Sequence, residues 1–374
     1  MRDARAEPPH AEEALRAPEW AASAASRADA FLAEVRRAGA TARPRRGALR
    51  VLTWNVQLLP GVFPGQAGDA ASLVRRARRI AARLRELCLA TRVDCVCLQE
   101  VWHDGAARAL LRHLADVLPH AHRPDAFCGL VTLWRRGYAL AHAHFRPFDA
   151  RAGVEGAWFT KGVSVVTLFP VQPEPPDRPR PVPDPSPILL LLNTHTQSDF
   201  WRPGATVRAR QFPVVLDALR RSAFAATPLD AENNTPLAKP FAVLCGDLNV
   251  HADSHEYLTA MRALGNPRDP LRGNTDARTF PIGRYVHGCD AFGLCGGSSG
   301  YRRVEPETRL DYVLDLGGWA AAATEATNEE GEVEERERGW EGFARAWVLA
   351  EGMAEGDEGE PLSDHAPVFA AMAR

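Results

Sequence analysis

Short apolar runs and amphipathic stretches alternate along the chain from residue 49 onward. Residues 70–90 carry apolar side chains at three- and four-residue spacing between arginines, which predicts an amphipathic helix, and residues 104–118 are predicted to form a second one. Short continuous apolar runs are typical of buried strands, and they occur at 49–54, 95–98, 128–134, 138–145, 163–169, 188–192, 241–245 and 309–314. We therefore expect a fold of both helices and strands, with the strands buried under the helices.

Three stretches fall outside this pattern. Residues 10–38 are Ala-rich with weak apolar spacing, which predicts one or two helices, and the basic sequence TARPRRG that follows is interpreted as a linker. Residues 171–187 contain eight prolines and are predicted to form an exposed insertion, either a plain loop or a ligand for an SH3-type domain. Acidic residues make 325–360 a predicted surface excursion. We expect a helical extension and linker at 1–48 and one domain at 49–374 with these two insertions.

The composition is that of an ordinary soluble globular protein. Of the 374 residues 45% are hydrophobic and 25% are charged, and the formal net charge is -2. Because this total provides no broad positive field, it counts against a protein held on nucleic acid. No apolar run approaches the roughly 20 residues of a membrane-spanning helix, and the acidic N-terminal stretch lacks the apolar core of a signal peptide. We expect a cytoplasmic protein or one at the periphery of a membrane.

The seven cysteines are few for a chain of this length. Buried free thiols are expected where cysteines lie in apolar runs, at Cys95, Cys97, Cys128 and Cys245. In a Gly-rich stretch, Cys289 and Cys295 are the pair that could form a disulfide, and their spacing matches no zinc motif.

Polar and acidic side chains recur where the predicted strands end. Buried strand ends tolerate such groups when they are paired or bind a cation. Six strands would deliver carboxylates, amides and imidazoles to one edge of a sheet, at Asn55, Glu100, Asn193, Thr194, His195, Asp247, Asn249, Asp311, Asp364 and His365. Each residue alone is more simply explained as a turn former, a helix cap, a surface acid or a core histidine. Their recurrence on six strands favours one shared site.

The donor types in this set indicate the chemistry of such a site. Oxygen ligands from Asn, Asp and Glu, with one or two imidazoles and no converging thiolates, suit Mg²⁺ or Mn²⁺ rather than structural zinc. A divalent ion beside His and Asp side chains provides a Lewis acid, an oriented water and a base. These are the components that hydrolysis of a phosphate ester requires.

Six motifs follow one another over residues 49–374: TWNVQLLP, CLQEVW, NTHTQ, CGDLNV, RLDYVL and SDHAPV. In this order they resemble the endonuclease/exonuclease/phosphatase superfamily of Mg²⁺-dependent phosphoesterases. Within that superfamily, the stretches TWNVQLLP, GAWFTKGVSVV, NTHTQSDFW and GDLNVHADSHEY look most like neutral, bacterial-type sphingomyelinases. The resemblance implies the α/β class: a four-layered α/β sandwich in which two mixed β-sheets pack face to face and are flanked by helices.

The resemblance also implies a set of metal and phosphate ligands. Glu100 is expected to be the principal Mg²⁺ ligand, with Asn55 beside it and Mn²⁺ as the alternative ion. Asp247 and Asn249 would hold the scissile phosphate and the nucleophilic water, and a second ion at these two residues is left open.

The same resemblance implies the groups that move protons. His365 is the candidate general base and is also counted among the candidate metal ligands. Asp311 is the first choice for the carboxylate that orients its ring and Asp364 the second, because adjacent residues of a strand point to opposite faces. His195 would stabilise or protonate the leaving alkoxide, and Lys161 would place a positive charge near the phosphoryl group.

The leading hypothesis is a sphingomyelin phosphodiesterase, which hydrolyses sphingomyelin to ceramide and phosphocholine in peripheral contact with a membrane. A first alternative keeps the site and changes the substrate to DNA, RNA or a phosphoinositide. The arginines between 75 and 85 favour it only weakly, because they spread around more than one helix face. A second alternative is an inactive scaffold. It predicts loss of a metal or base residue, and none of these residues is lost.

Two further groups of side chains lie near these motifs or on the predicted strands. Packing is expected, with binding of a choline headgroup as the alternative, for Trp54, Trp102, Trp158 and Trp201. His142 and His144 share one face of a predicted strand. For them we favour exposed strand histidines over a metal site.

Overall fold

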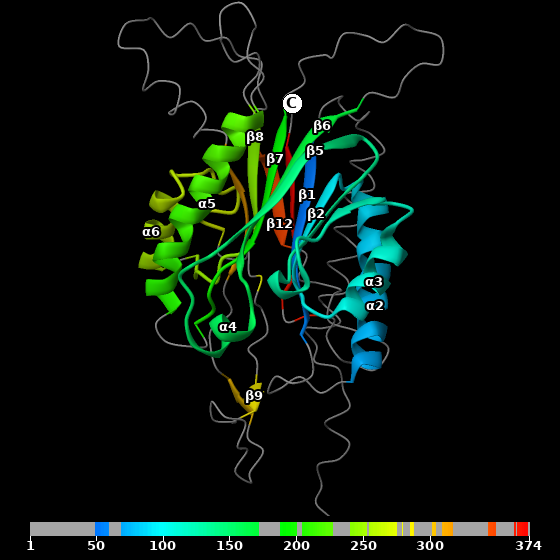
Figure 1. Ribbon diagram of the computed structural model, residues 1–374, viewed down its shortest axis with the longest axis horizontal. Coiled ribbons are helices and arrows are strands. Elements are labelled where there is room, and N and C mark those ends of the chain that lie inside the picture. The colour runs from blue at the N-terminus through cyan, green and yellow to red at the C-terminus, as the bar shows by residue number, and fades with distance from the viewer. Residues whose placement is uncertain are drawn as a thin grey trace, which may run out of the picture.

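Two β-sheets pack face to face, with helices on both outer faces, in the computed structural model of the chain (Figure 1). The structure describes residues 49–59, 69–171, 188–199, 204–226, 240–252, 254–274, 279, 285–287, 301–303, 309–316, 343–348, 363 and 365–372.

The sheets are both mixed. In spatial order the first contains β12 (Phe343–Val348), β13 (Val368–Met372), β1 (Leu49–Leu58), β2 (Cys95–Val101), β4 (Val131–Trp134) and β3 (His120–His122). The second contains β11 (Asp311–Asp315), β8 (Phe241–Asp247), β7 (Leu189–His195), β6 (Gly162–Pro170) and β5 (Tyr138–Pro147). Strands β1 and β2 are parallel, as are β7 and β8, and the remaining neighbours in these sheets are antiparallel. A separate pair is formed by β9 (Tyr285–His287) and β10 (Tyr301–Arg303).

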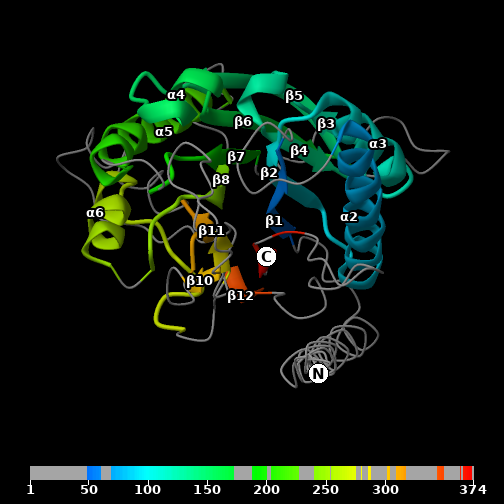
Figure 2. The ribbon, with the colours of Figure 1, turned by 90° about the horizontal axis from the view of Figure 1, so that it is seen from below.

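Helices form the two outer layers. The first sheet is covered by α2 (Ala70–Thr91) and α3 (Asp104–Leu114), and the second by α5 (Gly204–Ala226) and α6 (His255–Ala263). Figure 2 shows these pairs on opposite sides of the sandwich. The shorter α4 (Gly153–Trp158) and the 3-10 helix η2 (Ala126–Cys128) lie in connections between strands. The four layers confirm the predicted α/β sandwich.

The apolar runs are continuous because both faces of the central strands are buried. On β1, Leu52 and Trp54 pack in the core beneath α2 and α3, whereas Leu49 and Val51 pack in the core between the sheets. A strand alternates its side chains between two faces, so burial on both sides requires an apolar residue at nearly every position.

Strand register brings polar strand ends to one edge of each sheet. In the first sheet Asn55 pairs with Gln99, one residue before Glu100. In the second sheet Asp247 lies between His195 on β7 and Asp311 on β11. The parallel pairs β1–β2 and β7–β8 therefore end together, as the positions of the polar residues predicted.

One polar strand-end residue lies between the sheets instead. The side chain of Asn193 is fully buried, accepts a hydrogen bond from Gln99 Nε2 at 2.8 Å, and donates to the carbonyl oxygens of Leu98 and Val131 at 3.1 Å. Gln99 also donates to the Thr53 hydroxyl at 3.0 Å. Asn193 thus joins the two sheets and is not one of the side chains at the polar edge.

Part of the predicted acidic insertion is a strand. Residues 343–348 form β12 and pair with β13 at the edge of the first sheet, a strand that was not predicted within 325–360. The sequence FARAWV alternates small and large side chains in the two-residue period of a strand, but the acidic residues around it masked this signal. The structure also ends the predicted helix 104–118 at Leu114 and adds β3 and α4, which were not predicted.

Several predictions fall outside the described residues. They concern the extension at 1–48, the Pro-rich insertion beyond residue 171, the rest of the acidic insertion, and four residues: Trp201, Cys289, Cys295 and Asp364.

The cysteine prediction can be checked at four positions. Buried free thiols are confirmed at Cys95, Cys97, Cys128 and Cys245. Among the helices that the structure describes, none has the length and apolar character needed to cross a membrane.

Candidate active site

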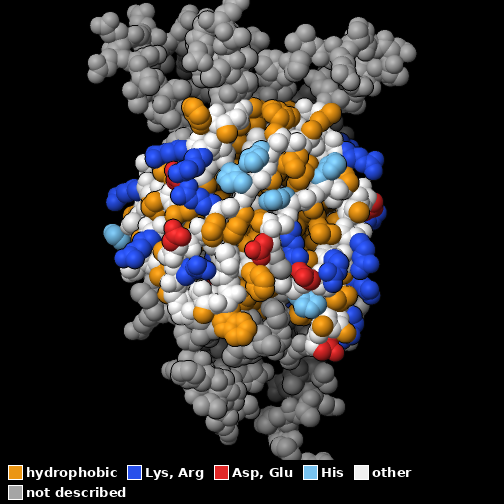
Figure 3. All heavy atoms as spheres, in the orientation of Figure 1, with side chains coloured by type: hydrophobic (Ala, Val, Ile, Leu, Met, Phe, Trp, Pro, Cys, Tyr) orange, Lys and Arg blue, Asp and Glu red, His pale blue; other side chains and the backbone are white. Residues whose placement is uncertain are grey.

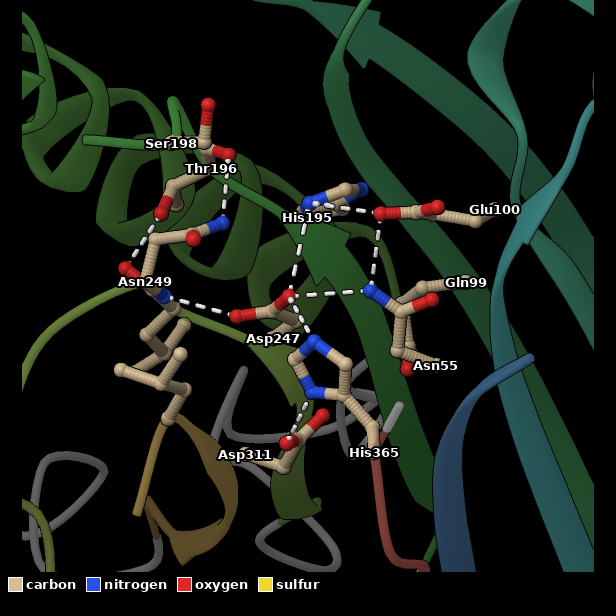
Figure 4. Close-up of polar contacts among 12 residues, drawn as sticks. Asn55, Gln99, Glu100, His195, Thr196, Ser198, Asp247, Asn249, Asp311 and His365 are labelled. Carbon is tan, nitrogen blue, oxygen red and sulfur yellow. Dashed lines mark hydrogen bonds and ion pairs between the residues drawn. The ribbon is translucent and has the colours of Figure 1, made fainter. Parts of the chain in front are cut away.

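Side chains from both sheets converge at the polar edge of the sandwich (Figure 4). Asn55 lies near the end of β1 and Glu100 near the end of β2, whereas the end of β7 and the end of β8 carry His195 and Asp247. Asp311 begins β11 and His365 precedes β13. The structure therefore brings these six members of the predicted site together.

Asn55 connects carboxylates of the two sheets. Its Nδ2 atom donates to Glu100 Oε1 and to Asp247 Oδ2, both at 3.0 Å. Its Oδ1 atom accepts from the backbone N–H of Gln57 at 3.1 Å, which orients the amide. Two carboxylates that converge on one point repel each other unless a positive group lies between them. Here the amide N–H₂ of Asn55 partly fills that role.

The backbone at the site is strained at specific points. Glu100 has a φ of 60° and Asn249 a φ of 50°, and such left-handed non-glycine residues cost about 1–3 kcal/mol each. Gly246 has a φ of 148°, and a Cβ atom there would lie 1.9 Å from the carbonyl oxygen of Thr194. Only glycine allows β8 to approach β7 this closely just before Asp247.

His365 and Asp311 form a close pair. His365 Nδ1 lies 2.7 Å from Asp311 Oδ2, and its Nε2 lies 3.8 Å from Asp247 Oδ2. Both His365 and Asp311 are buried. The short contact at Nδ1 assigns the ring proton to that atom, because an ionised carboxylate can only accept. The other ring nitrogen, Nε2, then carries the lone pair on the side of Asp247.

Backbone and hydroxyl groups fix the position of His365. The indole Nε1 of Trp54 donates to the carbonyl oxygen of His365 at 2.7 Å. The Ser363 hydroxyl accepts from the backbone N–H of His365 at 3.2 Å and donates to the carbonyl oxygen of Asn55 at 2.6 Å. These bonds connect the imidazole to β1, which carries Asn55.

Thr279 is a supporting residue that sequence reasoning missed. Its hydroxyl accepts from the backbone N–H groups of Leu310 and Asp311 at 2.9 and 3.1 Å, and its carbonyl oxygen accepts from Ala366 at 2.7 Å. It thereby connects the segments of Asp311 and His365. Thr279 follows no strand and lies in no motif, so nothing in the sequence pointed to it.

His195 lies between the carboxylates and a lysine. Its Nε2 atom is 3.5 Å from Asp247 Oδ2, 3.9 Å from Glu100 Oε1 and 3.1 Å from Lys161 Nζ. Burial, Lys161 and His365, in this order, hold the pKa of His195 well below its usual range. The ring is therefore neutral at pH 7.

Glu155 on α4 is a further residue that the sequence did not indicate. It forms an ion pair with the buried Lys161 and accepts from the backbone N–H and the hydroxyl of Ser198 at 3.2 and 3.0 Å. It also accepts from the side-chain amide of Gln197. Glu155 pairs its carboxylate with the Lys161 ammonium and ties α4 to the loop after β7. It escaped prediction because it lies on a short helix rather than at a strand end.

Arg208 supports the same loop from α5. It is fully buried, donates to both carboxylate oxygens of Glu256 at 2.6 and 2.7 Å, and donates to Asp199 at 2.7 Å. It also donates to the carbonyl oxygen of Gln197 at 2.8 Å. A buried guanidinium with two carboxylates and a carbonyl is well compensated, and it holds the loop between β7 and α5.

Asp247 and Asn249 form a compact turn. The backbone N–H of Asn249 donates to Asp247 Oδ1 at 2.8 Å, and its Nδ2 atom donates to the carbonyl oxygen of Thr196 at 3.2 Å. Burial raises the pKa of Asp247 to about 6, with a smaller upward contribution from Asp311, against His365 and the Asn55 hydrogen bond, which lower it. The site thus concentrates more negative charge than its protein groups compensate.

The tryptophans near the motifs differ in burial. Trp54 and Trp102 are buried, as expected for packing. Trp158 was also expected to pack, and this was wrong, because its side chain is 61% exposed at the end of α4. Phe127 in η2 is similarly exposed at 65%.

The sequence pattern of the Endonuclease/Exonuclease/phosphatase family matches residues 52–365. The chain belongs to this family. The matched segment contains all the converging side chains described above, so the polar edge of the sandwich lies within the family's shared region. A comparison with curated protein sequences gave no significant match.

Solved structures of similar fold include proteins of different specificity. Sphingomyelinase C from Streptomyces griseocarneus aligns with a TM-score of 0.54 and 23% identity, over 88% of this chain and 100% of its own. TDP2 from D. rerio, complexed with a single-stranded DNA product, aligns with a TM-score of 0.55 and 13% identity over the same shares. A beta toxin variant from Staphylococcus aureus with bound magnesium ions aligns with a TM-score of 0.53 and 16% identity, again over 88% and 100%. At these identities the likeness establishes the fold.

The donor set fits a hard divalent cation. Among the described residues, two groups have ligand atoms within 4.8 Å of one another: Glu100 with His195 and Asp247, and Asp247 with Asp311 and His365. Asp247 belongs to both groups. Carboxylate oxygens that are buried together in this way favour cations such as Mg²⁺ or Mn²⁺, and a cation would offset the charge that burial otherwise penalises.

A divalent cation should raise the melting temperature of the protein, because a ligand that binds only the folded state stabilises it by about 2.7 kcal/mol at 100 times its dissociation constant. The measurement is thermal unfolding in EDTA and during titration with MgCl₂. Asp247→Asn should lose most of the shift. Asp116→Asn, which removes an exposed carboxylate paired with Arg85, is the matched control and should keep it. An equal shift in Asp247→Asn would contradict cation binding at this site.

Proposed function

We propose that the chain is a Mg²⁺- or Mn²⁺-dependent phosphodiesterase that hydrolyses a phosphocholine lipid, with sphingomyelin as the leading substrate and ceramide and phosphocholine as products. One observation carries the proposal. The pair of His365 and Asp311 directs an imidazole nitrogen toward Asp247, beside the carboxylate of Glu100 and the amide of Asn55. A base and a cation-binding group therefore adjoin each other, as hydrolysis of a phosphate ester requires.

Glu100, Asn55 and Asp247 are the groups proposed to hold the cation. When bound, the ion would polarise the phosphoryl oxygens and compensate negative charge as it develops in the transition state. Asn55 would turn its carbonyl oxygen toward the ion, since its Nδ2 atom now lies between the two carboxylates. Asn249, held through its backbone by Asp247, would orient the phosphate and the nucleophilic water.

His365 is proposed as the general base. Asp311 accepts the Nδ1 proton, so Nε2 can remove a proton from water. The imidazolium that forms would be stabilised by Asp311, which is the role of the carboxylate in a catalytic triad.

His195 and Lys161 are proposed to serve the leaving group. Because the pKa of His195 is held well below its usual range, its neutral ring would not act as a full acid. Its Nε2 atom accepts from the Lys161 ammonium and would position that group beside the leaving oxygen. Lys161, 3.1 Å from the ring, would supply the positive charge.

A lipid substrate is supported by the aromatic side chains beside the site. Phe127 and Trp158 are exposed on neighbouring segments, since the carbonyl oxygen of Phe127 accepts from the backbone N–H of Thr160 at 2.9 Å. The ring of Phe159 packs at a tilt of 34° against the ring of Trp102, with centroids 3.9 Å apart, and Trp102 lies two residues after Glu100. Figure 3 shows hydrophobic side chains on the lower part of the described surface, the part in which Figure 1 places α4. Aromatic rings with one exposed side are suited to a membrane interface.

An anionic polymer or a phosphoinositide is the second candidate. Arg76 on the basic helix α2 donates to the backbone and side-chain oxygens of Gln57 at 3.0 and 3.2 Å, so this arginine reaches the end of β1 two residues from Asn55. The similar fold of TDP2 with bound DNA product belongs with this alternative. The net charge of -2 favours the lipid. An inactive scaffold is disfavoured because the described site residues retain the base, its carboxylate and the cation ligands.

The substrate proposal predicts release of phosphocholine from sphingomyelin vesicles in Mg²⁺ or Mn²⁺ and none in EDTA. The purified protein should be assayed in parallel on sphingomyelin, lysophosphatidylcholine, plasmid DNA and a phosphoinositide. Metal-dependent DNA nicking or phosphoinositide turnover without phosphocholine release would replace the lipid with the second candidate. Loss of all four reactions in a folded protein would favour the scaffold.

The base proposal predicts that His365→Ala lowers kcat by about 10²-fold or more, since positioned acid–base groups contribute about 10²–10⁴-fold. Asp311→Asn should lower it as well, because the ring then loses the acceptor that orients it. The exposed His113→Ala on α3 is the matched control and should retain full turnover. Unfolding curves show whether each variant is folded. Near-normal turnover in a folded His365→Ala protein would exclude His365 as the general base.

The aromatic pair should contribute to vesicle binding but not to chemistry. Burial of a large aromatic side chain contributes about 1.5–3 kcal/mol, so the double variant Phe127→Ala/Trp158→Ala should bind sphingomyelin vesicles at least roughly tenfold more weakly. Its turnover of a water-soluble phosphocholine ester should stay unchanged. Phe224→Ala is the control, since Phe224 is an equally large aromatic residue that is 86% exposed on a different element, α5. Equal vesicle affinity in the double variant would exclude this surface from membrane contact.

A further inference from the structure

Two His-Ala-His tripeptides lie on edge strands of the two sheets. Residues 120–122 form β3, the edge of the first sheet, and residues 142–144 lie on β5, the edge of the second. Figure 2 shows β3 and β5 adjacent on one side of the sandwich, and Figure 3 shows histidine side chains gathered over β5. Segments about 20 residues apart in sequence thus present imidazoles to one region of the surface.

Three of these rings interact. The two-residue period of a strand puts His142 and His144 on the same face of β5, where their rings stack with centroids 5.4 Å apart. His122 lies on the adjacent strand β3, and protonation of either ring would lower its pKa. The fourth histidine, His120, stacks on Trp134 at 5.7 Å. His122, His142 and His144 are hereafter called the histidine cluster.

The cluster contains ring nitrogens that the fold leaves without partners. His122 Nε2 and His144 Nδ1 are enclosed, yet neither has a hydrogen-bond partner within the described part of the chain. An unpaired buried polar atom costs about 1–3 kcal/mol, so this arrangement is costly unless a ligand satisfies both nitrogens. Candidates are a proton donor or a metal ion.

The local charges favour a metal that binds neutral imidazole. Burial lowers the pKa of His122, and the two neighbouring histidines lower it further. Burial, His142 and Arg146, in this order, lower the pKa of His144. These shifts favour the neutral form of His122 and His144, which is the form that coordinates metals. The positive charge of Arg146 is compensated by its ion pair with Asp217.

We propose that the histidine cluster is a binding site for a divalent first-row transition ion of the Zn²⁺ class. Three imidazoles without a carboxylate suit Zn²⁺ or Cu²⁺ and not Mg²⁺. The rings are stacked rather than converged, so His142 and His144 turn about their side-chain bonds to bring nitrogens to the roughly 2.0–2.1 Å that a Zn–N bond requires. Water would complete the coordination on the exposed side, where His142 lies.

This site is separate from the candidate active site. His144 pairs with Val165 on β6, four residues beyond Lys161, which is about 13 Å along an extended strand. The two sites also differ in ligand type, since the active site offers mainly carboxylate oxygens. The proposal therefore does not depend on the proposed function.

The test measures Zn²⁺ binding to the full chain by isothermal titration calorimetry in excess Mg²⁺, which is added to compete at the carboxylate site. The wild-type protein should bind one Zn²⁺ that His122→Asn/His144→Asn does not bind. The matched control His113→Asn/His255→Asn, which changes two exposed histidines on α3 and α6, should bind it normally. Asp247→Asn should also retain it, because that variant alters only the active site.

A single substitution at an exposed position separates loss of Zn²⁺ binding from loss of folding. His142 is exposed, so His142→Asn should keep the melting temperature and weaken Zn²⁺ binding at least tenfold. With Cu²⁺ as the probe, the wild-type electron paramagnetic resonance spectrum should show hyperfine coupling to imidazole nitrogens, and the folded His142→Asn protein should show fewer of them. The proposal is overturned if the wild-type protein binds no such Zn²⁺, if both cluster variants bind it unchanged, or if Asp247→Asn abolishes it.

Discussion

A buried hydrogen bond between the side chains of Gln99 and Asn193 joins the two sheets of the sandwich. The remaining donors of these amides reach Thr53 and the carbonyl oxygens of Leu98 and Val131. Because a buried amide without partners costs about 1–3 kcal/mol, any sliding of one sheet over the other would be penalised. This constraint sets how the ends of β1 and β2 face those of β7 and β8. The convergence of the candidate site depends on that alignment, since its carboxylates come from both sheets.

The site contains strained backbone and poorly compensated negative charge, and the packing of the rest of the sandwich holds both in place. Glu100 and Asn249 have strained backbones, and the carboxylates of Glu100 and Asp247 share one amide donor. Burial raises the pKa of Asp247, which expresses the cost of keeping this charge without a cation. Strain and unbalanced charge of this kind persist only where the surrounding structure holds them, and they cluster at functional sites. Here the three apolar cores provide that support.

Much of this architecture could be predicted from the chain alone, and the exceptions have physical causes. Alternation and helical periodicity located the main elements because these patterns record which faces are buried. They failed for β12, whose alternating sequence lies among acidic residues. They also failed for α4, whose residues Glu155 and Trp158 act through contacts and exposure that no local pattern encodes. At the site, the carboxylates, amides and imidazoles at strand ends were visible in the sequence, but Asn193 looked identical to them. Only the packing of the two sheets, which places Asn193 of β7 against Gln99 of β2, shows that its side chain faces the opposite sheet.

The sequence by itself determined which side chains were available and on which strands they lie, because residue type and hydrophobic period are local properties. It also indicated the family through the order of its motifs. The tertiary structure alone decided which of these groups meet. The contact of His365 with Asp311 joins residues 54 positions apart, and that of Asn55 with Asp247 spans 192. The pairing of Lys161 with Glu155 and the gathering of histidines from β3 and β5 likewise depend on packing. Distances between such segments are set by the docking of two sheets, which no single stretch of sequence specifies.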